Sequence, residues 1–369
     1  MKENWTYKKL GEVCDEAQTY KWGDKEKKYI DLTSVDRETH CITETIVVNK
    51  ENAPSRAKQL VKIGDVLFGT TRPTMKRVCV IDDLFDEQVC STGFCLLRPT
   101  QSVLPRWIYY NLLSDSFYSY IEPLQNGVAY PAVSNKDVRN YQIPIPPIEA
   151  QSRIVSELDL LQSIIDKQQV QLKELDNLAQ AVFYDMFGDP MENEKGWSVK
   201  KLNEICLELF AGGDVPKDCY SQEKTTDFQT PIISNGIGER AIYGYTNKAR
   251  VFDESITISG RGTIGYCEVR TEPYFPVVRL IVGVPNKKMV LPTFLKYVID
   301  AHHLNGVGVA IPQLTIPMVK DINIILPPLP IQQSFNDKIK SIEKLKTAIS
   351  KSIMETQKLY DYTTDKYFG

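Results

Sequence analysis

The chain has 369 residues, of which 42% are hydrophobic and 25% are charged, and its formal net charge is −3 at pH 7. This length allows two or three domains with separate cores, and the composition is that of an ordinary globular protein. A general polyanion-binding protein is disfavoured because such proteins are usually basic, so any nucleic-acid binding must use local patches or a partner's help.

Neither a membrane anchor nor a metal site is expected. The N-terminal stretch MKENWTYKKLGEV lacks the apolar segment of a signal peptide, and the chain has no run of 18 apolar residues. Eight cysteines are scattered without a CxxC motif, and there are three histidines. This usage disfavours a zinc site or a disulfide framework and indicates reduced thiols in a cytoplasm.

The first 145 residues predict a β-rich domain. Short strand-like runs such as ITETIVVN, DVLFGTT and KRVCVID are separated by Gly, Pro, Asn and Asp. We therefore expect residues 1–145 to form the first globular domain.

A long helix is predicted over 146–188. After Pro146-Pro147, heptad positions alternate in steps of four and three, with Gln168 as the one interruption. The apolar members are Ile154, Leu158, Leu161, Ile165, Leu172, Leu175, Ala179, Val182 and Met186. Forty helical residues would span about 60 Å.

The second half of the chain repeats the first. NWTYKKLGEVC at 4–14 recurs as GWSVKKLNEIC at 196–206, and IPIPPIEAQ at 143–151 recurs as IILPPLPIQ at 324–332. QNGVAYPAVS at 125–134 meets LNGVGVAIPQLT at 304–315. We therefore expect two tandem units, 1–188 and 189–369, with a second globular domain at 189–325 and a second long helix at 326–369.

The second helix carries a weaker heptad pattern, interrupted by Lys346, Thr356 and Thr363. Its other positions are Phe335, Ile339, Ile342, Ile349, Ile353, Tyr360 and Tyr367. A short link separates the first helix from the second domain, so the second helix is expected to run back antiparallel to the first as a coiled coil. The expected fold class is therefore mixed α/β (α+β). Two pseudo-symmetric units would be carried on a rod formed by the two helices. The alternative is that each helix packs on its own domain.

The stretch TISGRGTIGYCEV at 257–269 contains GxGxxG, the pattern of a dinucleotide-binding turn. That site needs a helix after the glycines, whereas β-branched and aromatic residues follow here. In the matching stretch of the first repeat, FGTTRPTMKRVCV at 68–80, Arg72 aligns with Arg261, but Pro73 aligns with Gly262. No bound cofactor is therefore expected, and the shared feature is a small-residue turn that carries an arginine.

A strand–turn–strand with hydroxyls, backbone amides and an arginine suits a nucleic-acid groove. Amides and hydroxyls bond phosphate, and an arginine can pair with a guanine edge. With the loops after Asn126-Gly127 and Asn305-Gly306, the candidate DNA contacts are Thr70, Thr71, Arg72, Lys76, Arg77, Tyr130, Ser259, Arg261, Thr263, Arg279 and Gln313. The alternative is a tight hairpin whose arginine pairs with a nearby carboxylate.

Catalytic motifs are missing from the sequence. It contains no GxxxxGK[ST] phosphate loop, no [DN]PP[FYW] amino-methyltransferase motif and no evident Ser/His/Asp or Cys/His arrangement. We therefore expect no catalysis by this chain.

Taken together, the tandem repeat, the PPxxxQ helix starts and the junction MFGDPMENEKGWSVKKL at 186–202 resemble the specificity (S) subunit of type I restriction–modification enzymes. The resemblance implies that each globular part is a mixed α/β target recognition domain for one half of a bipartite double-stranded DNA sequence. It implies that the helices set the half-site spacing and dock two modification subunits, which bring S-adenosylmethionine and N6-adenine methylation. Two restriction subunits would bring ATP, Mg and cleavage, in the cytoplasm of a bacterium or archaeon.

Three other functions remain open at this point. The repeated domains could bind protein, with the helices as a spacer, or an enzyme could use a cofactor at GRGTIG. Within the family, the chain could belong to a system that only methylates.

Overall fold

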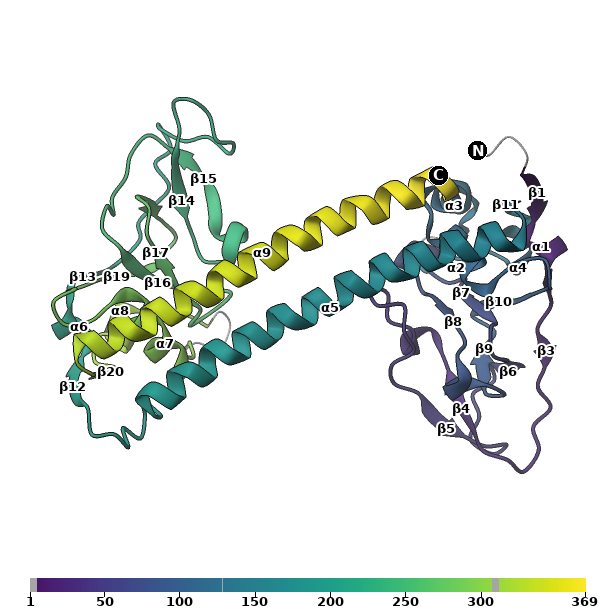
Figure 1. The fold of residues 1–369 in the computed structure, drawn as a ribbon, viewed down its shortest axis with the longest axis horizontal. Coiled ribbons are helices and arrows are strands. Elements are labelled where there is room, and N and C mark those ends of the chain that lie inside the picture. The colour runs from purple at the N-terminus through teal and green to yellow at the C-terminus, as the bar shows by residue number, and fades with distance from the viewer. Residues whose placement is uncertain (1–4, 128, 307–311) are drawn as a thin grey trace. The chain divides into compact units, whose positions relative to one another are not determined.

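The computed structural model describes residues 5–127, 129–306 and 312–369. The chain divides into two compact units (Figure 1). Unit one is Met1–Gln169 with Lys351–Gly369, and unit two is Val170–Ser350. Each of the two long helices is therefore shared between the units, whereas each repeat of the sequence contains one whole helix.

Unit one is built on three sheets among its described residues. A two-stranded sheet pairs β1 (Thr6–Lys9) with β11 (Gln142–Ile145). A four-stranded sheet has the order β2 (Cys14–Asp15), β10 (Phe94–Pro99), β7 (Val66–Gly69), β8 (Val78–Val80). A five-stranded sheet has the order β3 (Gln18–Thr19), β6 (Ala57–Leu60), β9 (Val89–Ser91), β4 (Lys27–Ile30), β5 (Ile46–Val48).

Short helices cover the four-stranded sheet of unit one. They are α1 (Leu10–Val13), α2 (Pro105–Leu113), α3 (Asp115–Ile121) and α4 (Asn135–Asn140), with 3-10 turns at Leu32–Ser34, Pro73–Met75, Asp83–Phe85 and Glu122–Leu124. In α2, Trp107 is fully buried, and its indole N–H donates to the carbonyl oxygen of Pro144 at 2.8 Å. This bond ties α2 to β11, just before the first long helix.

Unit two repeats this arrangement with fewer strands among its described residues. Its sheets are β12 (Ser198–Lys201) with β20 (Asn323–Leu326); β13 (Cys206–Ala211), β19 (Ile281–Pro285), β16 (Ser255–Ile258), β17 (Cys267–Arg270); and β15 (Ile242–Thr246), β14 (Thr230–Ile233), β18 (Phe275–Pro276). Its helices are α6 (Leu202–Ile205), α7 (Pro292–Ala301) and α8 (Ile316–Val319), with a 3-10 turn at Gly238–Ala241.

The two units share their topology as well as their sequence. The parallel pair β4–β9 corresponds to β14–β18, and the antiparallel hairpin β7–β8 corresponds to β16–β17. The predicted mixed fold with two tandem pseudo-symmetric units is confirmed.

The long helices are α5 (Ile148–Phe187) and α9 (Leu329–Phe368). Pro146-Pro147 and Pro327-Pro328 directly precede them, and Gly188, at φ 75°, follows α5 in the left-handed conformation that glycine favours. The starts of both helices and the end of α5 therefore lie where the proline and glycine signals predicted them.

Each unit contains one end of each helix. In unit one, Ile154 and Leu158 of α5 share a core with Tyr367 and Phe368 of α9. The alternative in which each helix packs only on its own domain is therefore wrong. Within each unit the helices run antiparallel, and their pairing as one continuous coiled coil stays a prediction.

The side chains predicted to form the interface between the two long helices are buried to different degrees. The buried positions are Ile154, Leu158, Leu161, Ile165, Phe335, Ile339 and Ile342. The half-buried positions are Leu172, Leu175, Ile349 and Ile353. Two of the polar interruptions make side-chain contacts across the helix pair: Gln168 Nε2 donates to Ser352 Oγ at 2.7 Å in unit one, and Lys346 Nζ lies 2.8 Å from Asp176 Oδ1 in unit two.

A buried glutamine fixes the start of each long helix. The amide of Gln151 accepts from Leu104 N at 2.9 Å and donates to the carbonyl oxygens of Ser102 (3.0 Å) and Pro146 (2.9 Å). Gln332 makes the same three bonds in unit two, with Leu291, Met289 and Pro327. The repeated PPxxxQ motif therefore ties the helix start to the N-terminus of α2 or α7.

We expect Gln151→Ala to lower the free energy of unfolding of unit one by about 2–4 kcal/mol, because it leaves buried main-chain groups without partners. Hydrogen exchange of unit-one peptides in the full chain measures this. Gln169→Ala, at an exposed position of the same helix, should change little. Equal effects of the two substitutions would contradict the role given to Gln151.

Candidate nucleic-acid interface

The arginine-bearing turns connect two antiparallel strands in each unit. Arg72 lies between β7 and β8, and Arg261 lies between β16 and β17. The GxGxxG stretch is thus the tip of a hairpin, as predicted. It does not form the strand-to-helix turn that cradles a pyrophosphate.

The two arginines are not at equivalent positions, and the alignment that superposed them is wrong by one residue. The turn has nine residues in unit one (69–77) and eight in unit two (259–266). Gly69 N bonds Arg77 O as Ser259 N bonds Tyr266 O, so Arg72 matches Gly262. Both have left-handed φ angles, 50° and 66°. The backbone conformation therefore sets the correspondence at this turn, and the shared residue type does not.

A second loop returns to the turn in both units. Val133 N donates to Thr70 O at 3.0 Å, and Leu314 N donates to Gly260 O at 2.9 Å. These are the loops expected from the Asn-Gly repeat. Residues 128 and 307–311 of these loops lie outside the described residues. The turn and the returning loop together form the candidate interface.

In unit one, this interface presents Arg72 and Tyr130. Arg72 is exposed, its guanidinium lies 4.9 Å from the centre of the Tyr130 ring, and Tyr130 is 69% exposed. Arg72 N donates to Pro131 O at 2.7 Å, which holds the turn against the loop. An arginine stacked on an exposed aromatic ring can bond a phosphate or a base edge without a large loss of side-chain entropy.

Lys76, also in unit one, lies 4.7 Å above the ring of Tyr118. Burial raises the pKa of Tyr118 further above neutral pH, and the uncharged phenol offers Lys76 its ring face. Lys76 also lines a hollow of about 950 Å³ with His40 and Tyr109. Burial lowers the pKa of His40, which opposes a second positive charge there.

Two predicted contacts of unit one have hydrogen-bond partners within the protein. Thr70 is buried and donates its hydroxyl to Gly93 O at 2.8 Å. Arg77 Nη1 donates to the carbonyl oxygens of Leu32 and Val35. These bonds account for both residues as supports of the hairpin. Thr71 is half-buried and forms a main-chain bridge with Ala132.

In unit two, three predicted residues converge. Arg261 Nη2 and Arg279 Nη1 both donate to Gln313 Oε1, at 3.0 and 3.3 Å. They come from the β16–β17 turn, the loop between β18 and β19, and the returning loop. No carboxylate among the described residues forms an ion pair with Arg72 or Arg261, so the alternative of a hairpin arginine paired with an acid is wrong.

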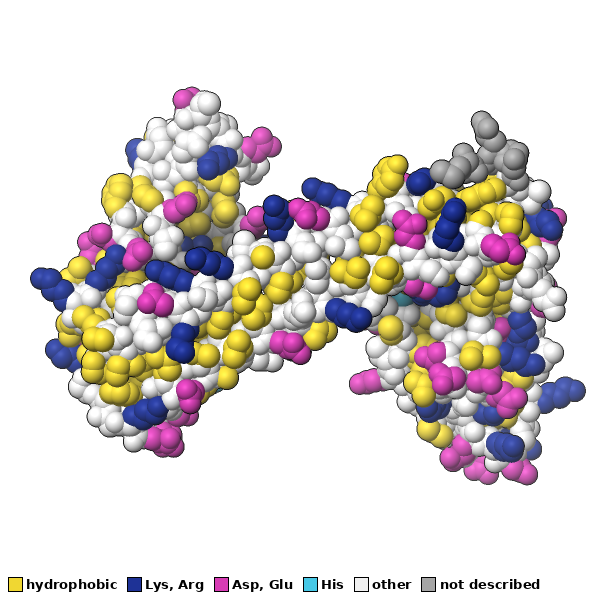
Figure 2. Space-filling model, viewed as in Figure 1, with side chains coloured by type: hydrophobic (Ala, Val, Ile, Leu, Met, Phe, Trp, Pro, Cys, Tyr) yellow, Lys and Arg dark blue, Asp and Glu magenta, His cyan; other side chains and the backbone are white. Residues whose placement is uncertain are grey.

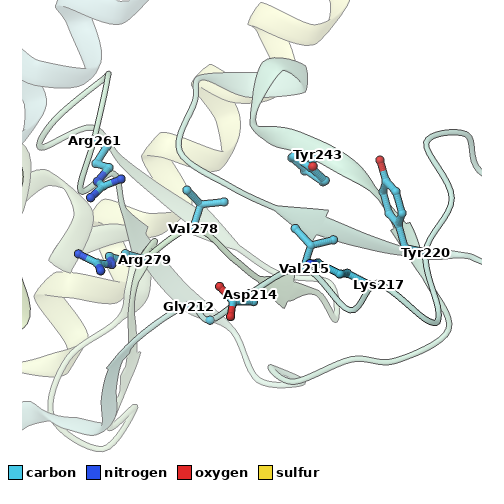
Figure 3. A pocket seen from close by; sticks show the side chains of 10 residues that line it. Gly212, Asp214, Val215, Lys217, Tyr220, Tyr243, Arg261, Val278 and Arg279 are labelled. Atoms are coloured by element: carbon cyan, nitrogen blue, oxygen red, sulfur yellow. The ribbon is translucent and has the colours of Figure 1, made fainter. Parts of the chain in front are cut away.

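The two arginines line a cleft of about 720 Å³. Figure 3 shows Arg261 and Arg279 at one end of the cleft and Tyr220 and Tyr243 at the other. The rings of Tyr220 and Tyr243 are 5.7 Å apart. The cleft thus places guanidinium groups beside aromatic rings, and both side-chain types contact nucleic acids in other proteins.

The other two predicted residues of unit two lie inside the turn. Ser259 is buried, whereas Thr263 is half-buried. Thr263 Oγ1 and Arg261 Nε are enclosed and have no hydrogen-bond partner in the part of the chain that the structure describes. Enclosed polar atoms without partners are uncommon in native proteins, and these two leave hydrogen-bonding capacity at the turn that a bound water or ligand could use.

Sequence reasoning missed Asn235, whose side chain bonds both arginine-bearing loops. Its Oδ1 accepts from Gly260 N at 2.7 Å, and its Nδ2 donates to Val278 O at 2.8 Å. The one available signal was the turn-forming SNGIG at 234–238, directly after a strand. It also missed Lys217, Tyr220 and Tyr243 of the cleft.

Charge on the visible surface is mixed. Figure 2 shows Lys and Arg side chains interspersed with Asp and Glu over the face of each unit. This distribution agrees with the net charge of −3 and favours recognition by a few directed side chains over a broad basic surface. Among the described residues, none of the helices is long and apolar enough to cross a membrane, and no group of three metal-ligating side chains is found.

Comparison with known proteins shows that two segments of the chain match the same family. The model described as the type I restriction modification DNA specificity domain covers residues 2–176 and 194–356. The chain is similar to two putative type I specificity subunits of Mycoplasma pneumoniae. Identity is 29% over 205 residues with S.MpnORF507P (55% of each chain) and 34% over 154 residues with S.MpnORF89P (41% of this chain, 45% of that one). The chain thus spans about half the length of these curated relatives.

One solved structure supports the fold over the whole chain. It comes from work on the structural basis of complex assembly and conformational transition of the type I R-M system. The match has a TM-score of 0.63 at 24% identity and covers 99% of this chain and 98% of that one.

Proposed function

Because the chain belongs to the type I restriction–modification DNA specificity family, we propose that each of its units reads one half of a bipartite double-stranded DNA target. The observation that carries this proposal is the repeated interface, in which an arginine-bearing turn meets a returning loop. Each unit supplies one such interface, at Arg72–Tyr130 in unit one and at Arg261–Arg279–Gln313 in unit two. Joining two readers in one chain combines their binding energies without a second association cost.

The chain itself performs no chemistry in this proposal. Two modification subunits dock on it and bring S-adenosylmethionine and adenine N6-methylation, and two restriction subunits bring ATP and Mg. The modification subunits also contact DNA, which compensates for the chain's net negative charge. The complex acts in the cytoplasm of a bacterium or archaeon, where the eight unpaired cysteines stay reduced.

Purification of the complex tests these partners. The full chain is tagged in its host, and the bound proteins are incubated with labelled S-adenosylmethionine and DNA from a strain that lacks the gene. We expect a DNA methyltransferase to co-purify and to transfer methyl groups to this DNA. Recovery of the chain without any methyltransferase would contradict the proposed docking.

The helices are proposed to set the gap between the half-sites. Removing one heptad from each helix, residues 170–176 and 344–350, shortens each by about 10 Å, which equals about 3 base pairs of DNA. This pair of deletions removes Asp176 and Lys346 together, and Glu343, the second partner of Lys346, is exposed to solvent. We expect methylation at a target with a changed gap, or none, and unchanged half-site bases. Altered half-site bases with an unchanged gap would count against this role.

A further inference from the structure

We propose that Asn235 is the positioning residue of the interface in unit two, and that it holds Arg261 and Arg279 in the geometry that reads a guanine in the half-site of this unit. The inference rests on the proposed DNA-reading function. It adds the residue that positions the two arginines, whose side chain we call the clamp, and the base that the arginines recognise. Asn235 lies two residues after β14. Its Oδ1 accepts from Gly260 N at 2.7 Å and its Nδ2 donates to Val278 O at 2.8 Å, so one side chain joins the two loops.

The loop held by the Nδ2 end of the clamp is strained. Val278 and Arg279 have φ angles of 53° and 58°, in a region that β-branched and long side chains rarely adopt. Their amides donate to Gly213 O at 2.9 Å and Gly212 O at 3.0 Å. Such a conformation persists only where neighbouring bonds fix it, and here the bonds from Asn235, Gly212 and Gly213 do so.

The turn held by the Oδ1 end is closely packed. A β-carbon added at Gly260 would lie 3.0 Å from Leu314 O and 3.1 Å from Arg279 O. The turn, the strained loop and the returning loop therefore meet at one glycine. Release of the clamp would alter the positions of both arginines, since each is within one residue of a clamped main-chain atom.

The clamp brings two guanidinium groups to one acceptor. Arg261 and Arg279 both donate to Gln313 Oε1 despite their like charges. The guanine edge in the major groove presents two neighbouring acceptors, O6 and N7, and arginine is the side chain that most often bonds them. Guanine is thus the base whose edge best replaces Gln313 Oε1 as the acceptor for this pair.

Unit one has a leucine at the position that matches Asn235, so its turn is held by other contacts. Leu32 lies two residues after β4 as Asn235 does after β14, and it packs beside Gly69 and Gly93. The amide of Thr70, which matches Gly260, donates to the main-chain oxygen of Gly93 at 2.9 Å. The side-chain clamp therefore belongs to unit two, and its removal should affect one half-site.

The test is a genome-wide methylation map in the host that carries each variant of the full chain. We expect Asn235→Ala to reduce discrimination for guanine in one half-site about ten- to a hundredfold, as measured from cognate and near-cognate sites, and to leave the other half-site unchanged. Asn203→Ala, an exposed asparagine of the same unit, should give the wild-type map.

Arg261→Lys and Arg279→Lys keep the charge and remove the planar fork, so each should relax the same guanine even if Asn235→Ala folds poorly. Three results would overturn the inference: unchanged discrimination in Asn235→Ala, equal loss at both half-sites, or a half-site of unit two without a G·C pair. A wild-type map without any bipartite motif would instead overturn the proposed function.

Discussion

Substitution Phe335→Ala is expected to lower the free energy of unfolding of unit two by about 3–5 kcal/mol, the range for removing a fully buried aromatic ring. Phe335 is completely buried near the start of α9. Its ring centre lies 5.7 Å from that of Phe183, 5.3 Å from Phe187 and 5.1 Å from Tyr297. The ring therefore joins the start of α9 to the end of α5 and to α7.

Hydrogen exchange of peptides from 170–350 in the full chain measures this loss. The matched control is Leu345→Ala on the same helix, where the leucine is 56% exposed and the change should stay within about 0.5 kcal/mol. A small effect of Phe335→Ala, or equal effects of the two substitutions, would show that the helix ends do not pack together as described.

The second large effect is expected in DNA recognition. Arg72→Ala should weaken or relax one half-site and Arg261→Ala the other, because each side chain belongs to a separate unit. Loss of one bidentate base contact costs about 1–3 kcal/mol, which corresponds to roughly 5- to 150-fold in discrimination. The frequency of methylation at sites that differ in one base of either half-site measures this effect.

Exposed arginines of the same units serve as controls. Arg37→Ala in unit one and Arg240→Ala in unit two should leave the map unchanged. Equal loss at both half-sites from either Arg72→Ala or Arg261→Ala would indicate misfolding instead of a lost contact.

The helices and the repeat were predictable because their signals are local. The heptad spacing from Ile154 to Met186 and the proline and glycine at its ends define α5 without reference to the rest of the chain. The antiparallel return of the second helix was predicted from the short link after the first, whereas the packing of Tyr367 and Phe368 in the core of unit one was not, because it depends on contacts between distant segments.

The candidate site was only partly predictable because its bonds join distant segments. Arg261 is 52 residues from Gln313 and 26 from Asn235 along the chain. Residue type alone pointed to Arg261, Arg279 and Gln313, whereas the role of Asn235 depends on two loops meeting at Gly260. For the same reason, the sequence did not reveal that Thr70 and Arg77 bond to carbonyl oxygens inside the hairpin.

The most direct test of the central claim, that this chain reads a bipartite DNA sequence, is a methylation map of the host genome with and without the gene. The comparison uses a strain in which the chain co-purifies with an active methyltransferase. The account predicts that a two-part N6-methyladenine motif with a fixed gap disappears when the gene is deleted and returns when it is restored. An identical set of methylated motifs in both strains would contradict it.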